Sequence, residues 1–469
     1  MQNQSPRKNG WLPYVVGITI GLAVVCAAGF AVFAMFFYKP SAPKVPVETT
    51  PPPPAVVKFV TAAPTEQQPA QPQTLPEATA TPILAAQTTR PPEPAATPAP
   101  VEATQPAPQP SPVPSGLVPM ASPDYGIQAF LYWRPEVADR DLGLIKDAGF
   151  RWVKQEFAWR EIEGAGKGQF NWSNTDRMMD QIDQYGLHVI ARLGVQPAWA
   201  GGNYPDISPP DNYQDYADFV YAVATRYKGR IQAYQIWNEP NLAREWGNRP
   251  PSPAEYTQLL KVAYQAIKKA DPNAIVITAG LAPTTRNDDV AMPDMYFIQG
   301  LYDAGAQPYF DMLGVNAAGY RAPPEMDPGE VARDPNYANP GDFQAGTPEE
   351  LRRIYCFRHV EDVRRLMVQN NDADKRIAIM EFGWTTDDRP NSPYNWFHVS
   401  EQTQGEYIVR AYQYAKENWQ PWIGVMSLIY MPDADWTQDD EQWYWSIVVP
   451  RWPDAWPRPA YHMIKAMPK

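Results

Sequence analysis

The sequence predicts an α/β fold, the eight-stranded (β/α)8 TIM barrel, for residues 122–469. Short apolar runs alternate with helix-like patterns from Tyr125 onward, and this alternation occurs eight times. A last helix is expected near 459–467, and the length of the region suits one large barrel domain. The residues before 122 differ in composition, and we expect a transmembrane helix and a disordered, proline-rich linker there.

The chain starts with a polar segment, 1–10, which is followed by a long apolar run over 11–38. About 20 apolar residues span a bilayer, so this run is long enough. Apolar residues continue past the small residues near Cys26, which favours an uncleaved signal anchor over a cleaved signal peptide. Arg7 and Lys8 precede the run, so the positive-inside rule predicts that 1–10 is cytoplasmic. We therefore expect a single-pass protein of the cell membrane with an extracytoplasmic catalytic domain.

Residues 39–121 are dominated by proline, alanine, threonine, glutamine and valine, and residues 51–54 are consecutive prolines. Such a segment is extended, resembles polyproline II and has no hydrophobic core of its own. We expect it to act as a disordered spacer that holds the barrel away from the membrane.

The barrel itself is predicted from its strands in chain order. The expected strands are 125–131, 151–157, 188–193, 231–237, 275–280, 311–316, 377–381 and 423–430. The helices between them carry apolar residues three and four positions apart, as Tyr256, Leu259 and Ala263 do. At 252–255 and 347–350, a hydroxyl residue, a proline and a glutamate stand in capping order, which predicts helices with Ser252 and Thr347 as N-caps.

Charge and composition narrow the class of partner. The formal net charge is -12, and no basic run exceeds Arg7-Lys8, which argues against a nucleic-acid partner. The four histidines, at 188, 359, 398 and 462, lack metal-ligand spacing, so we expect no metal site and no cofactor. The 17 tryptophans and 26 tyrosines suit a large aromatic core, with some of them free to stack on sugar rings. The sequence leaves the oligomeric state open.

Two motifs carry the chemistry. Residues 237–241 are Trp-Asn-Glu-Pro-Asn, and residues 379–384 are Ile-Met-Glu-Phe-Gly-Trp, so each motif puts one glutamate at the C-terminal end of a predicted strand. Catalytic groups of parallel barrels lie at that end. Two carboxylates across a sugar-sized cleft, Glu239 and Glu381, are the equipment of a glycoside hydrolase. The amide of Asn238 is suited to bind the sugar 2-hydroxyl, a contact that strengthens in the transition state.

These motifs in strand order resemble those of the clan A glycoside hydrolases, with family 39 and the cellulase-like enzymes of family 5 as the nearest members. The segments 157–163, 168–172 and 197–199 are similar to family 39 as well. The resemblance covers essentially all of 125–469. It implies a TIM barrel with Glu239 as the acid/base and Glu381 as the nucleophile, and a retaining cleavage of a β-linked polysaccharide or oligosaccharide.

The chain departs from the family pattern after strand six. Family members often carry Val-His-x-Tyr-Gly there, whereas Asn316 and Ala318 stand here in place of the histidine and the tyrosine. Tyr320 is a candidate to supply the missing hydroxyl to the nucleophile. Where relatives have an arginine on strand two, Lys154 falls near that place, with Arg192 on strand three as an alternative cation.

Several aromatic residues are further candidates for the cleft. Trp159, Trp199 and Trp384 lie just past strand ends, although aromatic residues there are equally often packed beneath loops. Strand eight ends in a tyrosine instead of the usual tryptophan, so Tyr430, or else Trp436 or Trp443, is expected to form that sugar platform. His398 lies in a loop after the second motif and is a weaker candidate for substrate contact. The long segment 322–346 is expected to wall one end of the cleft.

The sequence thus predicts a membrane-anchored, retaining glycoside hydrolase that acts on a carbohydrate substrate. Two alternatives stay open. One is a non-catalytic carbohydrate-binding or scaffold protein on a degenerate barrel, which the changes at Asn316 and Ala318 keep in view. The other is a transglycosidase that uses the same two glutamates.

Overall fold

The computed structural model describes residues 120–451 and 453–469. The predictions of a cytoplasmic segment, a transmembrane helix and a linker therefore lie outside the described residues, apart from the last two linker positions. Within the described ranges, no helix is both long enough and apolar enough to cross a membrane. Met120 already packs against the apolar interior of the barrel, so the folded domain begins slightly before the predicted residue 122.

Eight parallel strands close into a barrel in chain order, with β1 paired to both β2 and β8. The strands are β1 Asp124–Gln128, β2 Trp152–Ala158, β3 His188–Gly194, β4 Ala233–Ile236, β5 Ile275–Ile277, β6 Met312–Ala318, β7 Arg376–Gly383 and β8 Ile423–Leu428. A short antiparallel pair, β9 Val448–Val449 and β10 Trp456–Pro457, follows the barrel. The predicted TIM barrel is confirmed, with strand ends that differ from the sequence prediction by a few residues.

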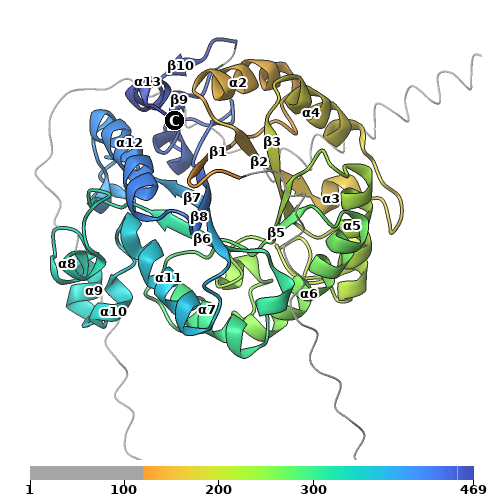
Figure 1. The fold of residues 1–469 in the computed structure, drawn as a ribbon, viewed down its shortest axis with the longest axis horizontal. Coiled ribbons are helices and arrows are strands. Elements are labelled where there is room, and N and C mark those ends of the chain that lie inside the picture. Colours follow the sequence, from red (N-terminus) through yellow and green to blue (C-terminus); the bar gives the residue numbers. More distant parts are fainter. Residues whose placement is uncertain (1–119, 452) are drawn as a thin grey trace, which may run out of the picture. The chain divides into compact units, whose positions relative to one another are not determined.

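Helices form a ring outside the barrel, and α13 near the C-terminus completes this ring beside α2 (Figure 1). The main helices of the ring are α2 Pro135–Asp147, α4 Ser173–Gln184, α5 Tyr213–Arg226, α6 Pro253–Ala270, α7 Asp294–Asp303, α11 Val360–Gln369, α12 Glu401–Asn418 and α13 Pro459–Ala466. Shorter helices are α3 Trp159–Ile162, α8 Pro328–Arg333, α9 Pro340–Ala345 and α10 Glu349–Arg352. The 3-10 turns are η1 Ala198–Ala200, η2 Ala243–Glu245, η3 Gln307–Tyr309, η4 Phe357–His359, η5 Asn395–Phe397 and η6 Glu441–Tyr444.

Side-chain alternation along the strands separates two apolar layers. On β2, Val153 and Phe157 face outward into the large core between barrel and helices, whereas Trp152 belongs to the small core inside the barrel. Lys154 shares the inward face with Trp152 because side chains on a strand alternate with period two. The barrel interior is therefore apolar at its base and charged toward its C-terminal mouth.

The two predicted N-caps, Ser252 and Thr347, differ in the structure. The Ser252 hydroxyl accepts a hydrogen bond from the Glu255 backbone N–H at 3.2 Å, so the predicted cap of α6 is confirmed. The prediction for Thr347 was wrong, because α10 is a single short turn without a side-chain cap. The Thr347 hydroxyl instead donates to Asp342 at 3.1 Å, so a local tertiary contact outweighs the capping signal.

The segment between β6 and α11 carries the short helices α8, α9 and α10, which lie side by side outside the helical ring (Figure 1). A second hydrophobic cluster fills the space between this insertion and the loops after β7 and β8. Its members include Tyr320, Tyr355, Phe397 and Trp445. The stretch 322–346, expected as a long loop, is thus a folded insertion with its own core.

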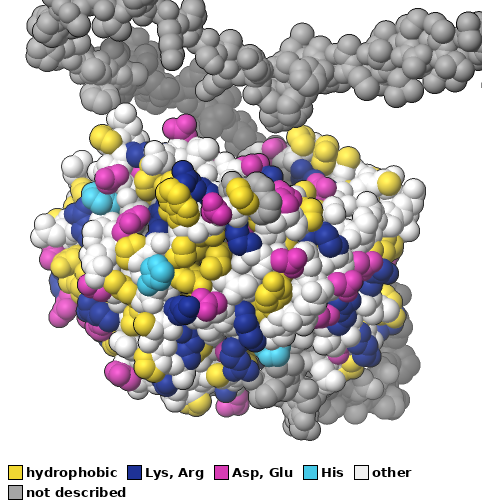
Figure 2. Space-filling view, turned by 90° about the horizontal axis from the view of Figure 1, so that it is seen from above, with side chains coloured by type: hydrophobic (Ala, Val, Ile, Leu, Met, Phe, Trp, Pro, Cys, Tyr) yellow, Lys and Arg dark blue, Asp and Glu magenta, His cyan; other side chains and the backbone are white. Residues whose placement is uncertain are grey.

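Acidic and basic side chains are interspersed over the face of the molecule that Figure 2 presents, with apolar patches between them. No broad area of a single sign occupies that face, in keeping with the modest excess of acidic residues in the chain.

Candidate active site

A cleft of about 690 Å³ opens at the C-terminal mouth of the barrel, where the ends of the parallel strands meet. Glu239 follows β4 and Glu381 lies on β7, and both side chains line this cleft. Their side chains are 15% and 17% exposed, respectively. Two carboxyl groups from distant parts of the sequence therefore share one cleft, with most of their own surface buried.

Glu239 sits in a backbone turn that ordinary residues rarely adopt. Trp237 has φ 69° and Glu239 has φ 41°, both in the left-handed region that costs free energy for residues other than glycine. The Glu239 backbone N–H donates to the carbonyl of Gly280 at 3.2 Å, and the buried Trp237 indole N–H donates to the carbonyl of Glu245 at 2.8 Å. These contacts hold the turn, and strain of this kind is common where a side chain must be aimed at a ligand.

The carboxyl group of Glu239 has two hydrogen-bond partners, a neutral amide and a charged guanidinium that is largely exposed. The Asn316 amide nitrogen donates to Glu239 Oε1 at 3.1 Å, and the largely exposed Arg244 guanidinium approaches Oε2 at 3.4 Å. Burial, followed by the negative charges of Glu381 and Glu245, raises the pKa of Glu239 to about 7, although Arg244 opposes the shift. At neutral pH this carboxyl group holds its proton much of the time.

Glu381 owes its direction to an irregularity in β7. Ile377 and Ile379 face the outer core, so strict alternation would turn Glu381 outward as well. The register between β6 and β7 shifts here: Val315 pairs with Ile379, but Asn316 already pairs with Glu381. The extra residue, Met380, joins the inner core, and the bulge turns the next side chain into the mouth.

Lys154 supplies the partner of Glu381. Its buried ammonium donates to Glu381 Oε1 at 3.0 Å and to the carbonyl of Met380 at 3.1 Å. Burial lowers the pKa of Lys154, while the charge of Glu381 opposes that shift. Arg192, the alternative cation, lines the same cleft but pairs with Glu156 at 2.8 Å. A buried cation thus stands 3.0 Å from Glu381, whereas the cation 3.4 Å from Glu239, Arg244, is largely exposed.

Three carboxamide side chains near the glutamates have oxygen atoms that accept no hydrogen bond. Gln128 at the end of β1, Asn238 after β4 and Asn316 on β6 all line the cleft. In each of them the side-chain oxygen is buried without a hydrogen-bond partner. Buried acceptors of this kind are costly unless a ligand donates to them, so the floor of the cleft suits a hydroxyl-rich molecule.

Other predicted residues also reach the cleft. Tyr320 and Tyr430 line it, together with the alternative platform Trp436, whose ring lies 5.2 Å from that of Tyr430. Tyr320, however, packs against Tyr355 and Trp396 in the second hydrophobic cluster, and the residue that hydrogen-bonds Glu381 is Lys154.

The predicted cleft positions of Trp159, Trp199 and Trp384 are corrected by the structure. Trp159 is fully buried, stacks on Phe219 and donates to Glu163 at 2.6 Å. Trp384 is fully buried and donates to the carbonyl of Ala322 at 3.1 Å. Each indole N–H is satisfied beneath a loop, so these rings support the barrel mouth from below.

Trp199 is half-buried, and its indole N–H donates to the carbonyl of Glu163 at 2.5 Å. His398 donates through Nδ1 to the carbonyl of Asn395, 2.6 Å away. Trp443 lies beneath the Arg458 guanidinium, 5.4 Å from the ring centre. None of these three is among the described residues that line the cleft.

Sequence reasoning missed much of the cleft wall. The additional lining residues include Gln128, Phe130, Arg244, Glu245, Thr285, Asp342, Tyr355, Tyr394, Trp396, Phe397, Glu441 and Trp445. Gln128 and Phe130 carried a usable signal, since both lie within the predicted strand 125–131. The others lie in loops, 3-10 turns and the short helix α9, where position in the sequence does not reveal which way a side chain points.

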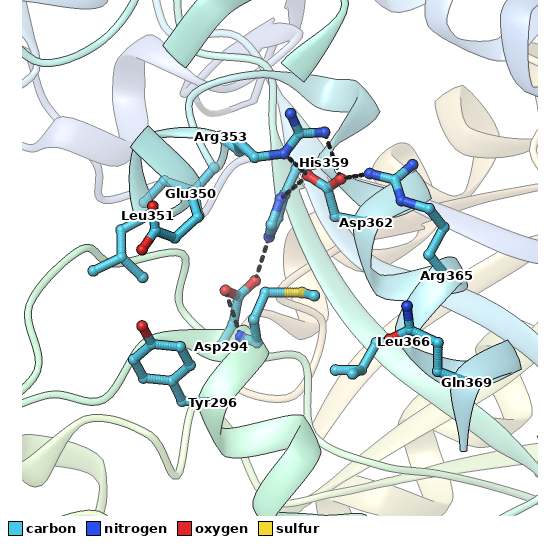
Figure 3. A pocket seen from close by; sticks show the side chains of 12 residues that line it. Asp294, Tyr296, Glu350, Leu351, Arg353, His359, Asp362, Arg365, Leu366 and Gln369 are labelled. Carbon is cyan, nitrogen blue, oxygen red and sulfur yellow. Dashed lines mark hydrogen bonds and ion pairs between the residues drawn. The ribbon is translucent and has the colours of Figure 1, made fainter. Parts of the chain in front are cut away.

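A second hollow of about 290 Å³ lies on the outside of the barrel between α7, α10 and α11 (Figure 3). His359 stands at its base between Asp294, 2.9 Å from Nε2, and Asp362, 3.1 Å from Nδ1. Arg353 donates to both oxygens of Asp362 at 2.7 and 3.0 Å. These charged groups are paired with one another, so the network joins α7 to α11 as a structural contact.

Comparisons with known proteins agree with this geometry. The family model described as beta-galactosidase, of glycoside hydrolase family 42, matches residues 129–250, which include β2 to β4 and Glu239. A search of the curated proteins finds no match.

Solved glycosidases share the fold at low sequence identity. A family 39 glycoside hydrolase from Bacteroides cellulosilyticus WH2 is 17% identical, with a TM-score of 0.53, and the match covers 74% of this chain and 63% of that one. A glucosidase from Croceicoccus marinus is 13% identical, with a TM-score of 0.51 and coverage of 74% and 67%. A family 5 enzyme from Streptomyces cattleya, in complex with Manβ1-4GlcNAc, is 12% identical, with a TM-score of 0.51 and coverage of 74% and 80%. The chain thus spans less than two thirds of the length of the family 39 protein.

Proposed function

We propose that the chain is a glycoside hydrolase of the clan A type and that it cleaves a β-linked glycoside with retention of configuration. The observation that carries the proposal is the contrast between two carboxyl groups in one cleft. Glu239 has a raised pKa and a neutral amide partner, whereas Glu381 has a buried ammonium partner. Two glutamates can act as acid and nucleophile when their surroundings differ enough to keep one protonated and the other ionised.

In the first step, a Glu381 oxygen bonds to the anomeric carbon as the bond from that carbon to the leaving oxygen breaks. Glu239 donates its proton to the departing oxygen, so the leaving group departs as a neutral alcohol. In the second step, Glu239 accepts a proton from water, whose oxygen attacks the anomeric carbon and releases Glu381 as a carboxylate. Two displacements at one carbon restore the original configuration, and Glu239 regains its proton.

The unpartnered oxygen of Asn238 supports its proposed role at the sugar 2-hydroxyl. Tyr430 and Trp436 offer aromatic faces to the apolar side of a sugar ring, which supports a carbohydrate as the substrate. The description of the matching family model, beta-galactosidase, and the β-linked disaccharide bound to the family 5 enzyme support the β-linkage. A non-catalytic scaffold would have no need of the strained turn that aims Glu239 or of the bulge that aims Glu381.

We also propose that the apolar run 11–38 anchors this domain outside the cell membrane, with 39–121 as the spacer. The full-length protein should fractionate with membranes, and a protease that cuts in the spacer should release the barrel. A mature N-terminus near residue 30 or 40 would show instead that the apolar run is a cleaved signal peptide.

The catalytic proposal is tested with the purified protein and a panel of β-linked aryl glycosides and oligosaccharides. NMR of the first-formed product, before mutarotation, reports its anomeric configuration. We expect the configuration of the substrate. An inverted product would exclude Glu381 as the nucleophile, and no turnover on any member of a broad glycan panel would favour the scaffold.

A further inference from the structure

The walls of the cleft are uneven around the barrel mouth. The side of β6 to β8 is high, because the insertion and the loops after β7 and β8 contribute a cluster of aromatic residues. The wall continues to the loop after β5, since the Thr285 hydroxyl donates to Asp342 at 3.1 Å and the Tyr355 hydroxyl also donates to Asp342. Within the part of the chain that the structure describes, the loop after β2 contributes no lining residue, and β3 contributes only Arg192. The lining of the cleft is therefore sparse toward β2 and β3.

Trp133 stands at the edge of this sparsely lined side. It lies in the loop after β1 and is 47% exposed, which is unusual for so large an apolar side chain. It lines a small hollow of about 10 Å³ that shares Gln128, Phe130 and Arg192 with the catalytic cleft, so Trp133 lies beside the cleft near the ends of β1 and β3. An exposed indole is thus located where a substrate would leave the cleft.

Aromatic rings connect the catalytic centre with this edge. Tyr430 and Trp436 both contact Phe130, with ring centres 5.8 and 4.8 Å apart. Arg134, the residue after Trp133, bonds to Asp433 at 3.3 Å and also pairs with Asp435, which holds the loop of Trp436 against the loop of Trp133. Both loops are therefore held in place before a ligand arrives.

Polar groups that suit sugar hydroxyls lie in the same small hollow. Arg192 and Glu156 form an ion pair at 2.8 Å, and their side chains keep 17% and 25% of their surface exposed. A planar donor and a planar acceptor beside an aromatic face offer both hydrogen-bonding directions that hydroxyl groups use, together with an apolar surface for the sugar C–H groups.

We propose that Trp133 forms an outer sugar subsite, which binds a unit of the substrate beyond those at the cleaved bond. Glu156 and Arg192 bind hydroxyl groups of that unit or of the unit before it. The natural substrate is therefore a chain of several sugars that extends over β2 and β3, not a disaccharide. This inference rests on the proposed glycosidase function and adds the length and direction of the substrate to it.

The test compares substrate lengths in the full-length protein. Cleavage of β-linked gluco-, xylo- and galacto-oligosaccharides, from disaccharides to hexasaccharides, is measured for wild type, Trp133→Ala and Trp133→Phe. We expect kcat/KM of wild type to rise with chain length. In Trp133→Ala the value for the longest substrates should fall about tenfold, with aryl monosaccharide glycosides unaffected and Trp133→Phe intermediate. Trp456→Ala is the matched control, because Trp456 is 53% exposed but lies on β10, outside the cleft lining.

Each outcome bears on the proposal. A loss confined to long substrates in the Trp133 variants, absent from Trp456→Ala, supports the subsite. Equal kcat/KM of wild type for all lengths, or the same length dependence in Trp133→Ala as in wild type, overturns it while leaving the glycosidase function intact. A wild-type protein that cleaves no member of the panel overturns the proposed function and the subsite with it.

Discussion

The ends of β4 and β7 each present a glutamate to the same cleft, but the two glutamates have different neighbours. Glu239 stands on a strained turn and accepts a hydrogen bond from the neutral amide of Asn316. Glu381 stands on a bulge and accepts a hydrogen bond from the buried ammonium of Lys154. The neutral amide and the largely exposed Arg244 compensate the burial of Glu239 only in part, whereas a buried cation stabilises negative charge on Glu381. Identical side chains thus receive different roles from their immediate neighbours.

The largest difference should appear when each carboxyl group is removed. Glu381→Ala should lower kcat on the order of 10⁴-fold for every substrate, because no covalent intermediate can form. Glu239→Ala should lower kcat about 10²- to 10⁴-fold for substrates whose leaving group needs a proton and much less for activated aryl glycosides. Steady-state kinetics with leaving groups of graded acidity measure this contrast.

Azide provides the control for that pair. It should partly restore the activity of Glu239→Ala by attacking the glycosyl intermediate, which gives an azide product with the configuration of the substrate. Equal sensitivity of both variants to the leaving group would contradict the division of roles.

Removal of the cation beside Glu381 should have the next largest effect. Lys154→Met deletes both hydrogen bonds that Lys154 makes, to Glu381 and to the Met380 carbonyl, so we expect kcat to fall about 10- to 100-fold. Lys268→Met is the control, since Lys268 pairs with Asp311 at 2.7 Å away from the cleft lining. A similar loss of kcat in both variants would indicate general destabilisation, which thermal unfolding would detect.

The neutral partner of Glu239 should set the alkaline limb of the pH profile. Because burial raises the pKa of Glu239 to about 7, kcat/KM should fall as pH rises through about 7 and the acid loses its proton. Asn316→Asp puts a second carboxylate within hydrogen-bond distance, which should raise that pKa and move the limb upward by about one pH unit.

The same substitution at Asn339 is the control for this limb. Asn339 lines the cleft and caps α9, a position that aspartate fills equally well. Asn339→Asp should leave the limb nearly where it is. A limb that does not move in Asn316→Asp would show that another group controls it.

The smallest expected effect is on stability, where the two glutamates should differ in sign. The folded-state pKa of Glu239, about 7, exceeds its ordinary value of 4.5, so the folded state binds the extra proton between these values and stability falls as pH rises through this window. Glu239→Gln removes the free-energy cost of ionising this buried carboxyl group. It should therefore stabilise the protein at pH 8 by about 1 to 3 kcal/mol, with no gain at pH 4.

Glu381→Gln is the opposing case. It leaves the buried ammonium of Lys154 without an anionic partner, so it should destabilise the protein at pH 8 by about 1 to 3 kcal/mol. Urea unfolding at both pH values measures the two variants. The same sign for both would mean that the surroundings of the two carboxyl groups do not differ as the structure indicates.

Much of the fold was predictable because periodicity is a local property. Each strand from β1 to β8 was evident as a short apolar run, and the eight runs imply a closed barrel with one catalytic mouth. The exposure of single aromatic residues was not predictable. Trp159 and Trp384 follow strand ends as Tyr430 does, yet only Tyr430 lines the cleft, because Trp159 packs against helix α5 and Trp384 against the segment of Ala322.

The sequence by itself determined the barrel and put Glu239 and Glu381 at the ends of β4 and β7, since alternation and motif position are read along the chain. The tertiary structure decided which way these groups point and what they contact. Strict alternation would have turned Glu381 outward, and only the pairing of β7 with its neighbours β6 and β8 reveals the bulge that turns it inward. The partners Lys154 and Asn316 lie 227 and 77 residues away from their glutamates. Contacts over such separations arise from closure of the barrel, and they govern the charge of each carboxyl group.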